Sequence, residues 1–416
     1  MTSSTVASVG WEQARHLAHQ QVAALPSRPV GLAAAIGCVL AEDLLAGCDL
    51  PLGDTSAMDG WAIHGPPPWS VVGASLAGRA SEHTRALTSS QAMVIATGAI
   101  VPPGSTGIVR SEWGVLDGDR LRLRDGLTVR PDLSDVRPRG HEATAGELLI
   151  RAGTRVAPTT AGLAAAAGHD TLPVHPRPRV SVLVLGDELL DTGPPRGGAV
   201  RDALGVQLPA WVSALGGEPV GVLRVADDPD STLSAVQADP ERSDVLVTTG
   251  GSARGAADHL RATLAALGAR IVVDTVDVRP GHPMLLAELP DGRRLVGLPG
   301  NPLAALAGVV TLLAPLLAGL GAAVLPVLDR VPVEEDVPML PGRRSRGYLL
   351  LPVSRTASGG VRSTGYAASA MLRGVALADG FLLVPPDGLS AGEPATVSWF
   401  PWTPAGRHAG SPGMMA

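Results

Sequence analysis

Hydrophobic and polar positions divide the chain into a helical start, a β-rich stretch and a stretch of alternating strands and helices. Residues 10–45 have apolar positions at helical spacing. Residues 46–140 hold short runs of valine, isoleucine and leucine between turn sequences such as PLGD and VPPG. This pattern predicts an all-β segment. Residues 160–168 predict one further short helix.

From Arg177 onward, apolar strand candidates alternate with helical segments. The strand candidates read RVSVLVLG, EPVGVLRVADD, DVLVTTGG, RIVVDTVDV and RRLVGLPG. Such alternation predicts βαβ units and a mostly parallel sheet. After Val327 the chain returns to short strands, which end near Trp402, and we expect a disordered tail over 403–416.

We therefore predict four domains before the tail, with an α/β and β fold class. An N-terminal helical and linker domain comprises residues 1–45 and 139–175, and a β-rich insertion domain of residues 46–138 interrupts it. The mostly parallel α/β domain spans residues 176–326, and a C-terminal domain resembling a β-barrel spans residues 327–402.

One uncharged stretch, residues 302–328, is long enough to cross a bilayer. However, Pro302, Pro315 and Pro326 interrupt it, and the segment from Gly319 to Gly321 marks a helix end. Periodicity alone does not separate a membrane span from a buried helix. We favour a buried helix followed by a turn, without membrane association.

Composition narrows the class of protein. With 45% apolar and 17% charged residues, the chain of 416 residues is expected to fold into several domains. Its net charge of −6 gives no broad attraction to nucleic acid. Cys38 and Cys48 form neither a disulfide framework nor a zinc pattern, and we expect no signal peptide in the first residues. We expect a cytoplasmic protein with reduced thiols.

Carboxylates, glycines and one cation follow the predicted strands of the α/β domain. These residues are Asp187, Glu188, Gly250, Gly251, Gly255, Asp258, Arg279, Pro280, Gly281, His282, Pro299, Gly300 and Asn301. Because the carboxyl ends of parallel strands meet at one edge of a sheet, we expect these groups to converge there.

Their chemistry fits an anion beside a metal ion. Gly250–Gly251 would let backbone N–H groups approach an anion, and the helix expected to begin near Ala256 adds its positive end. Aspartate and glutamate oxygens suit Mg²⁺ next to a phosphate, and Arg279 supplies a fixed positive charge. Each signal alone is also that of a turn or a helix cap, so the prediction depends on their combination.

Asn301 is the only asparagine in a chain that contains no lysine. In the sequence Gly-Asn-Pro, the proline fixes φ and starts the next helix. We expect the Asn301 side chain to cap this helix by accepting backbone N–H groups, while its amide donates elsewhere. An aspartate would add negative charge near the anion. The alternative is a turn residue without further function.

Seven motifs resemble those of the molybdopterin molybdenumtransferase family, which includes the E domain of gephyrin. The resemblance covers roughly residues 10–400. The motifs are TSAMDGWA (55–62), ATGAIVPPGSTGIVRSE (96–112), RPRGHEATAGELLIRAG (137–153), GDEL (186–189), TTGGSARGAADH (248–259), RPGHP (279–283) and LPGNP (298–302).

The resemblance implies an elongated homodimer of four-domain subunits that acts in molybdenum cofactor biosynthesis. Members of the family take adenylylated molybdopterin, release AMP and insert molybdate into the dithiolene, with the help of Mg²⁺ or another divalent cation. Their active site lies between the α/β domain of one subunit and the first two domains of the other. A molybdopterin adenylyltransferase upstream and molybdoenzymes downstream are the implied protein partners.

The resemblance also assigns roles to individual residues. It implies catalytic roles for Asp59, Glu188, Asp202 and Asp258, with Asp202 and Asp258 as metal ligands. Asp59 could instead be a turn residue and Asp202 a helix cap. The implied substrate-binding residues are Thr97, Gly98, Gly250, Gly251, Ser252, Arg279, Gly281, His282, Pro299, Gly300 and Asn301.

The sequence departs from the family in its anion-binding loops. RPGHP replaces Lys-Pro-Gly-Lys-Pro, and GGSARG replaces Gly-Gly-Val-Ser-Val-Gly. Ala203 and Leu204 stand where the family has serine or threonine and then asparagine, and the segment 341–349 is shortened. Arg279 keeps its positive charge. His282 would be mostly neutral at pH 7, so the site would lose about one charge.

Two functions from different classes follow. The chain is either a working molybdenum insertase with an adapted site, or a non-catalytic paralogue that binds the cofactor or a partner protein. The retained carboxylates favour the enzyme, because a drifting pseudo-enzyme has little reason to keep all four. An adenylylation activity is disfavoured because the resemblance extends well beyond the α/β domain.

Overall fold

The computed structural model describes residues 8–76, 78, 86–127, 131–238, 243–251, 259–338 and 347–403. The chain forms two compact units. Unit 1 comprises Met1–Arg28, Gly37–Val39 and His175–Ala416, and unit 2 comprises Pro29–Ile36 and Leu40–Val174. The predicted tail lies almost wholly outside the described residues, and the finer division into four domains stays a prediction.

The mostly parallel sheet predicted for the α/β domain is confirmed in unit 1. Its strands in spatial order are β18 (Glu218–Val225), β15 (Arg179–Leu185), β19 (Val245–Thr249), β23 (Arg294–Leu298), β22 (Leu285–Glu288) and β20 (Arg270–Val273). The first four are parallel, and β22 and β20 are antiparallel to their neighbours. The central strands are runs of valine and leucine because both faces of the sheet are covered.

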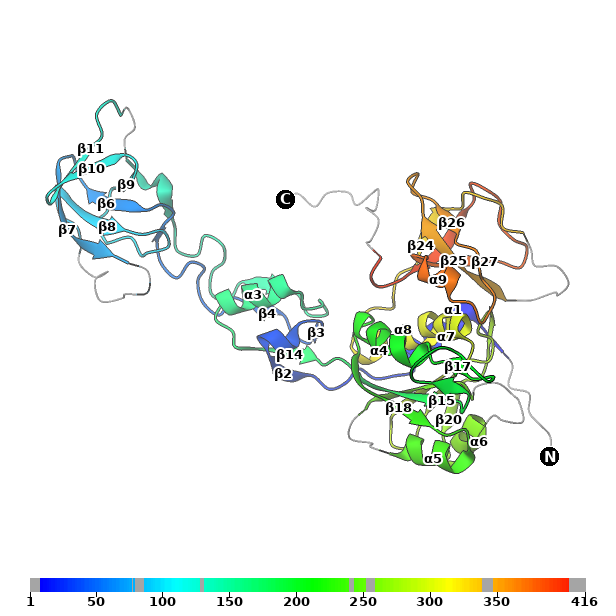
Figure 1. Ribbon diagram of the computed structural model, residues 1–416. Coiled ribbons are helices and arrows are strands. Elements are labelled where there is room, and N and C mark those ends of the chain that lie inside the picture. Colours follow the sequence, from blue (N-terminus) through cyan, green and yellow to red (C-terminus); the bar gives the residue numbers. More distant parts are fainter. Residues whose placement is uncertain are drawn as a thin grey trace. The chain divides into compact units, whose positions relative to one another are not determined.

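Helices cover both faces of this sheet (Figure 1). One face packs against α4 (Leu204–Ala214), α7 (Pro302–Gly308) and α8 (Ala314–Leu320), and the other against α5 (Pro229–Gln237) and α6 (His259–Ala266). The helices predicted between the strands are therefore confirmed where the structure describes them.

The uncharged stretch forms one continuous helix inside unit 1, as we expected. It runs through α7, a π-helical segment over Val309–Leu313 and α8, and it is 94% buried. By length and composition alone it could cross a membrane, and it is the only described helix that could. Its burial among the sheet and helices explains its apolar composition instead.

Helix α1 (Trp11–Gln20) packs against the π-helical segment, and two of its side chains form hydrogen bonds there. Trp11 donates its indole N–H to the Thr311 hydroxyl at 2.9 Å, and that hydroxyl donates to the Ala307 carbonyl at 2.6 Å. Arg15 donates to the carbonyls of Val310 and Pro326, at 3.2 and 2.6 Å. Burial lowers the pKa of Arg15 to about 10.

A second sheet in unit 1 combines strands from the N-terminal residues, from residues 276–279 and from the C-terminal part of the chain. In spatial order it contains β1 (Val9–Gly10), β21 (Val276–Arg279), β25 (Tyr348–Arg355), β27 (Gly380–Val384), β28 (Pro394–Trp399) and β24 (Asp329–Pro332), and β26 (Val361–Ser363) pairs with β25. A short helix, α9 (Arg373–Ala376), lies beside β25.

The single strand predicted from RIVVDTVDV is wrong. The chain breaks at Asp274, which is buried and ion-paired with Arg261. Residues before the break join the α/β sheet as β20, whereas residues after it join the second sheet as β21. The apolar run gave no sign of this break, because both halves have strand composition.

Unit 2 confirms the predicted β-rich segment. Its main sheet contains β10 (Gly114–Asp117), β11 (Arg120–Leu123), β7 (Trp69–Ser75), β8 (Gln91–Ile95), β6 (Gly60–His64) and β9 (Gly107–Arg110). Smaller sheets pair β5 (Thr55–Ser56) with β12 (Val136–Arg137), β4 (Leu44–Leu45) with β13 (Leu148–Ile150), and β2 (Arg28–Gly31) and β3 (Val39–Leu40) with β14 (Thr171–His175). The predicted helix near 160–168 is α3 (Pro158–Ala166).

Within the stretch 10–45, which we predicted to be helical, the prediction is mostly wrong for residues 31–44. Only α2 (Leu32–Ala35) forms, because Gly37 adopts a left-handed φ of 89°. Beyond it, Val39 and Leu40 are buried in a short strand. Tertiary burial here overrides the helical propensity of the alanine-rich sequence.

We predict that Thr311→Val lowers the free energy of unfolding by about 1–3 kcal/mol, because it leaves the buried Trp11 N–H without an acceptor. In a Trp11→Phe background the same change should cost less, since no indole N–H remains to be orphaned. Urea unfolding of the four proteins of this cycle measures the difference. An equal cost in both backgrounds would show that the bond contributes nothing.

Candidate active site

The exits of three parallel strands meet at one edge of the α/β sheet. Gly250, after β19, donates its N–H to the carbonyl of Leu298 at the end of β23, at 2.9 Å. A Cβ atom added to Gly250 would lie 3.3 Å from the carbonyl oxygen of Leu185, the last residue of β15. One added to Gly300 would lie 3.6 Å from the Cα of Gly250. The expected convergence of these loops is thus observed.

The carboxylates that follow β15 are exposed at this edge. The Glu188 side chain turns back toward Gly186, where an added Cβ would lie 2.8 Å from its Oε2. Asp187 accepts the N–H of Asp227, which follows β18, at 3.3 Å. Glu188 therefore stays near the strand exit, while Asp187 links it to the neighbouring loop.

Asp202 lies half-buried between helix α4 and strand β15. Its Oδ1 accepts the N–H groups of Leu204 and Gly205, both at 2.9 Å, and so caps the helix. A Cβ added to Gly205 would lie 2.3 Å from Oδ2 of Asp202 and 3.2 Å from Cγ2 of Val184. The capping role is real, yet it occupies only one of the two oxygens. The second oxygen of Asp202 accepts no hydrogen bond from the residues that the structure describes.

The residues alone could not indicate Asp202, because it follows no strand of the α/β sheet. A small parallel ladder of β16 (Leu189–Leu190) and β17 (Val200–Arg201) brings it back beside the exit of β15. Only the motif resemblance singled out this position. This return of the chain depends on tertiary structure, and no hydrophobic periodicity in the sequence predicts it.

Two threonine hydroxyls at the end of β19 were missed by the sequence analysis. Thr248 and Thr249 are buried, and neither hydroxyl has a hydrogen-bond partner among the residues that the structure describes. Thr249 pairs in register with Val184 on one side and Leu298 on the other, on the sheet face that α4 and α7 cover. An orphaned hydroxyl costs free energy unless something binds it. The sequence signal that could have identified these hydroxyls is a pair of polar residues at the end of an apolar strand.

The Gly-Gly turn works differently from our expectation. Gly250 and Gly251 both have left-handed φ angles, of 87° and 65°, which explains why glycine stands there. The N–H of Gly250 is occupied by Leu298, so it is not a donor for an anion. Ser252, Asp258 and the expected helix start near Ala256 lie outside the described residues.

The RPGHP loop reaches the same edge by an unexpected route. It follows β21 of the second sheet, but it leads into β22, whose Leu285 pairs with Gly297 near the end of β23. A Cβ added to Gly281 would lie 3.1 Å from the carbonyl oxygen of Ala304 in α7. The loop therefore packs against α7, the helix that follows the loop of Gly300.

The two basic residues of this loop are held differently. Arg279 is half-buried and forms no ion pair with any residue that the structure describes. His282 is exposed, and its Nδ1 lies 2.7 Å from the carbonyl oxygen of Val276. A carbonyl requires a donor, so Nδ1 carries the proton and Nε2 is left to meet a ligand.

The predicted cap by Asn301 is wrong. Its side chain makes no capping bond, although Asn301 does precede the helix and Pro302 begins it. The N–H groups of Leu303 and Ala304 instead donate to the carbonyl of Ser369, at 2.9 and 3.2 Å. Because Ser369 satisfies these donors, the exposed amide of Asn301 keeps its own donors and acceptor.

Asp59, Thr97 and Gly98 lie together in unit 2. The Oδ1 of Asp59 accepts both the N–H and the hydroxyl of Thr97, at 2.7 and 3.0 Å. These two donors, the N–H first, hold the pKa of Asp59 below its ordinary value. Gly98 follows Thr97 and donates its N–H to the carbonyl of Ser56. Asp59 is therefore an exposed carboxylate that Thr97 orients, and its functional role stays a prediction.

The residues at the sheet edge fit a divalent cation. Mg²⁺ needs only one or two protein carboxylates when phosphates and water supply its other ligands. Oδ2 of Asp202 has the chemistry of such a ligand, and the carboxylate of Glu188 is exposed at the exit of β15. No group of three His, Cys, Asp or Glu side chains gathers within the described part of the chain.

Comparisons with known proteins define the class first. The chain matches three family models in succession: the MoeA N-terminal region (domain I and II) over residues 9–168, a probable molybdopterin binding domain over 181–319 and the MoeA C-terminal region (domain IV) over 330–400. A solved MoeA structure from Pyrococcus horikosii aligns over 95% of this chain and 99% of its own with a TM-score of 0.72. At 23% identity it establishes the fold alone.

Curated relatives then establish the family. A molybdopterin molybdenumtransferase of Nostoc sp. is 31% identical over 305 residues, which cover 70% of this chain and 69% of the relative. One of Staphylococcus aureus is 29% identical over 340 residues, 78% of this chain and 79% of its own. The chain belongs to the molybdopterin molybdenumtransferase family, whose enzymes act in molybdenum cofactor biosynthesis.

We predict that Thr97→Val raises the pKa of Asp59 toward its ordinary value, because one of two donors is lost. A lowered carboxyl pKa stabilises the fold at neutral pH, and this stabilisation disappears as the pH falls through the folded-state value. The variant should therefore lose less stability on acidification. NMR titration of the side-chain carboxyl carbons measures the shift. Asp132, whose pKa is lowered by Ser134, is the internal control and should not change.

Proposed function

We propose that this chain inserts molybdate into adenylylated molybdopterin and releases AMP in a step that depends on Mg²⁺ or another divalent cation. The observation that carries the proposal is the half-buried carboxylate of Asp202, which caps α4 with one oxygen and retains the other beside the strand exits. A carboxylate in this position suits a cation that bridges to a phosphate.

The other residues of the edge support the same chemistry. Arg279, without an ion pair among the described residues, would offset negative charge that develops on the phosphates. The amide of Asn301 and Nε2 of His282 are left to bind substrate oxygens. The loops of Pro299–Gly300 and Gly281 would hold the substrate against the first turn of α7.

The reaction divides into a hydrolysis and an insertion. Water adds to one phosphorus of the phosphoanhydride, the bridging oxygen leaves with the other phosphate, and AMP and molybdopterin result. Asp202 would hold Mg²⁺, with Asp258 as the second ligand that the resemblance implies, and the bound cation would neutralise phosphate charge. Glu188 is exposed and accessible to solvent, so it is our candidate to take the proton of the attacking water. Molybdate then condenses with the two thiols: two Mo–S bonds form, one Mo–O bond breaks, and that oxygen leaves as water with both thiol protons.

We further propose a cytoplasmic homodimer. Family resemblance is the support: the active site of such proteins combines the α/β domain of one copy with the first two domains of the other. In that arrangement Asp59, Thr97 and Gly98 of one copy would serve the site of the second. A molybdopterin adenylyltransferase would supply the substrate, and molybdoenzymes would receive the product.

The first experiment uses the full chain with adenylylated molybdopterin, Mg²⁺ and molybdate. We predict AMP release together with active cofactor. In Asp202→Asn, AMP release should fall about hundredfold or more, because the charge is lost. Stability should change by less than about 1 kcal/mol, because asparagine retains the capping oxygen.

Asp228→Asn is the matched control. Asp228 caps α5 on the opposite face of the sheet by accepting the N–H of Ser231 at 2.8 Å, so its substitution should leave AMP release unchanged. Equal losses in the two variants would contradict the role of Asp202.

The second candidate function is a non-catalytic paralogue. The observation in its favour is His282, whose tie to Val276 leaves one ring nitrogen for an anion where the family has a flexible lysine. Tight binding of adenylylated molybdopterin by the wild-type chain without AMP release would establish this alternative and overturn the insertase.

A further inference from the structure

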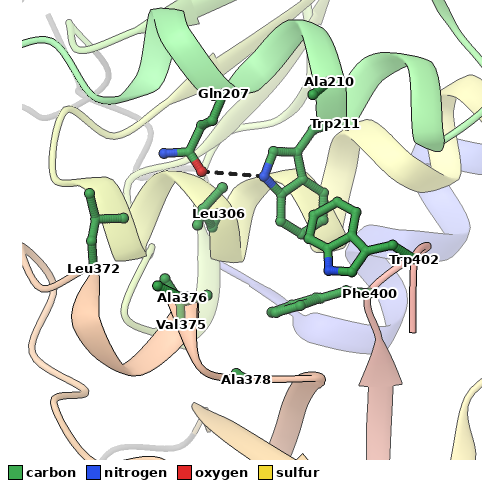
Figure 2. A pocket seen from close by; sticks show the side chains of 10 residues that line it. All are labelled: Gln207, Ala210, Trp211, Leu306, Leu372, Val375, Ala376, Ala378, Phe400 and Trp402. Atoms are coloured by element: carbon green, nitrogen blue, oxygen red, sulfur yellow. Dashed lines mark hydrogen bonds between the residues drawn. The ribbon is translucent and has the colours of Figure 1, made fainter. Parts of the chain in front are cut away.

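Residues 186–191, which comprise the turn after β15 and the short strand β16, carry Glu188, the candidate acceptor of the proton from the attacking water. The nearby cavity between α4 and α7, of about 420 Å³, supplies no such acceptor. Figure 2 shows that its lining side chains, Gln207 and Trp211 among them, are all uncharged. A proton acceptor on this face of the sheet must therefore come from the loops at the strand exits.

Arg224 on the neighbouring strand β18 binds residues 186–191 at three points. Its Nη2 donates to the carbonyl oxygens of Leu189 at 2.6 Å and Gly186 at 3.3 Å, and its Nη1 donates to Oδ1 of Asp191 at 2.5 Å. A planar guanidinium suits these acceptors because its donors lie in a fixed fork. The two carbonyls lie on either side of Glu188, so the bonds fix the backbone from which its side chain extends.

The sheet determines where this guanidinium lies. Strand β18 is an edge strand, and Arg224 pairs in register with Val184, one residue before the end of β15. Paired residues of neighbouring strands point to the same face of a sheet, here the face that α4 covers. Arg224 therefore extends from the edge strand beside the exit of β15.

The bonds around Glu188 leave its own carboxylate unoccupied. The Glu188 carbonyl accepts the N–H of Val200 in β17 at 2.9 Å, and the Asp187 side chain accepts the N–H of Asp227 at 3.3 Å. Gly186 has a φ of 133° and leaves room for the Glu188 carboxylate. That carboxylate accepts no hydrogen bond from any residue that the structure describes. A fixed backbone with a free carboxylate is what a general base requires.

Direct binding of a substrate phosphate is the alternative role for Arg224. Its two Nη atoms already donate to three acceptors, and the carboxylate of Asp191 offsets its charge. Arg279, in contrast, forms no ion pair within the described part of the chain. The geometry therefore favours support of Glu188 over contact with the phosphate.

We propose that Arg224 is a positioning residue, which holds residues 186–191 so that the Glu188 carboxylate accepts the proton of the attacking water. The inference rests on the proposed function for the task of Glu188. A shift of about 1 Å in a catalytic group can lower the rate about hundredfold, so loss of these three bonds should be visible in the kinetics.

The test measures AMP release from adenylylated molybdopterin by the full chain with Mg²⁺ and molybdate. We expect Arg224→Ala to lower kcat about tenfold to hundredfold and to leave KM nearly unchanged, because the substrate contacts remain. Arg224→Lys should restore little, since an ammonium group lacks the planar fork. Guanidinium chloride at a non-denaturing concentration should raise the kcat of Arg224→Ala and not that of the wild type.

Arg270→Ala is the matched control. Arg270 lies on β20 at the opposite edge of the same sheet and is ion-paired with Glu288, so its loss should leave kcat unchanged. A double-mutant cycle identifies the residue through which Arg224 acts. In a Glu188→Gln background Arg224→Ala should cost little further activity, because no base remains to be positioned.

Unchanged kcat in Arg224→Ala, a change confined to KM, or a full additional loss in the Glu188→Gln background would overturn the proposal. Hydrogen exchange at the N–H of Val200, which donates to the Glu188 carbonyl, separates this failure from failure of the insertase. If the wild-type chain releases no AMP, the insertase is rejected. Faster exchange at Val200 in Arg224→Ala, but not in Arg270→Ala, then retains Arg224 as the residue that positions Glu188, and equal exchange rejects it.

Discussion

The helix from Pro302 to Leu320 carries no charged side chain, so it must be covered along its whole length. The parallel sheet covers one side, α1 covers the π-helical part through Trp11 and Arg15, and the C-terminal part of the chain contacts its first turn. Burial of so much apolar surface is the main stabilising term in unit 1. It also fixes where the helix begins, and therefore where Asn301 lies.

Several polar side chains at the sheet edge keep unused hydrogen-bonding positions. Other groups of the chain satisfy the neighbouring backbone donors or orient these side chains. The Ser369 carbonyl takes the helix donors that Asn301 would otherwise cap, and the Val276 carbonyl orients His282. Asp202 in turn caps α4 with a single oxygen. Polar groups that have no partner among the described residues, such as the Thr249 hydroxyl, therefore lie at the sheet edge where we propose that the substrate binds.

Local patterns predicted much of this. The apolar strands and the residues that follow them placed Glu188, Gly250 and Gly300 at one edge, because that edge is a consequence of parallel topology. Tertiary events were not predictable. The ion pair at Asp274 breaks one apolar run into strands of two sheets, and the ladder that returns Asp202 has no period. The cap by Ser369 is a contact across more than sixty residues, which no local rule contains.

The pairing of β21 with β25 also has a consequence for the order in which the chain is made. Strand β21 ends at residue 279, and its partner is complete only at residue 355, which is 76 positions later. At about 5–20 residues per second, a ribosome needs about 4–15 s to add them. During that interval β21 lacks its neighbour β25, so a nascent chain holds an open sheet edge next to the loop of Arg279.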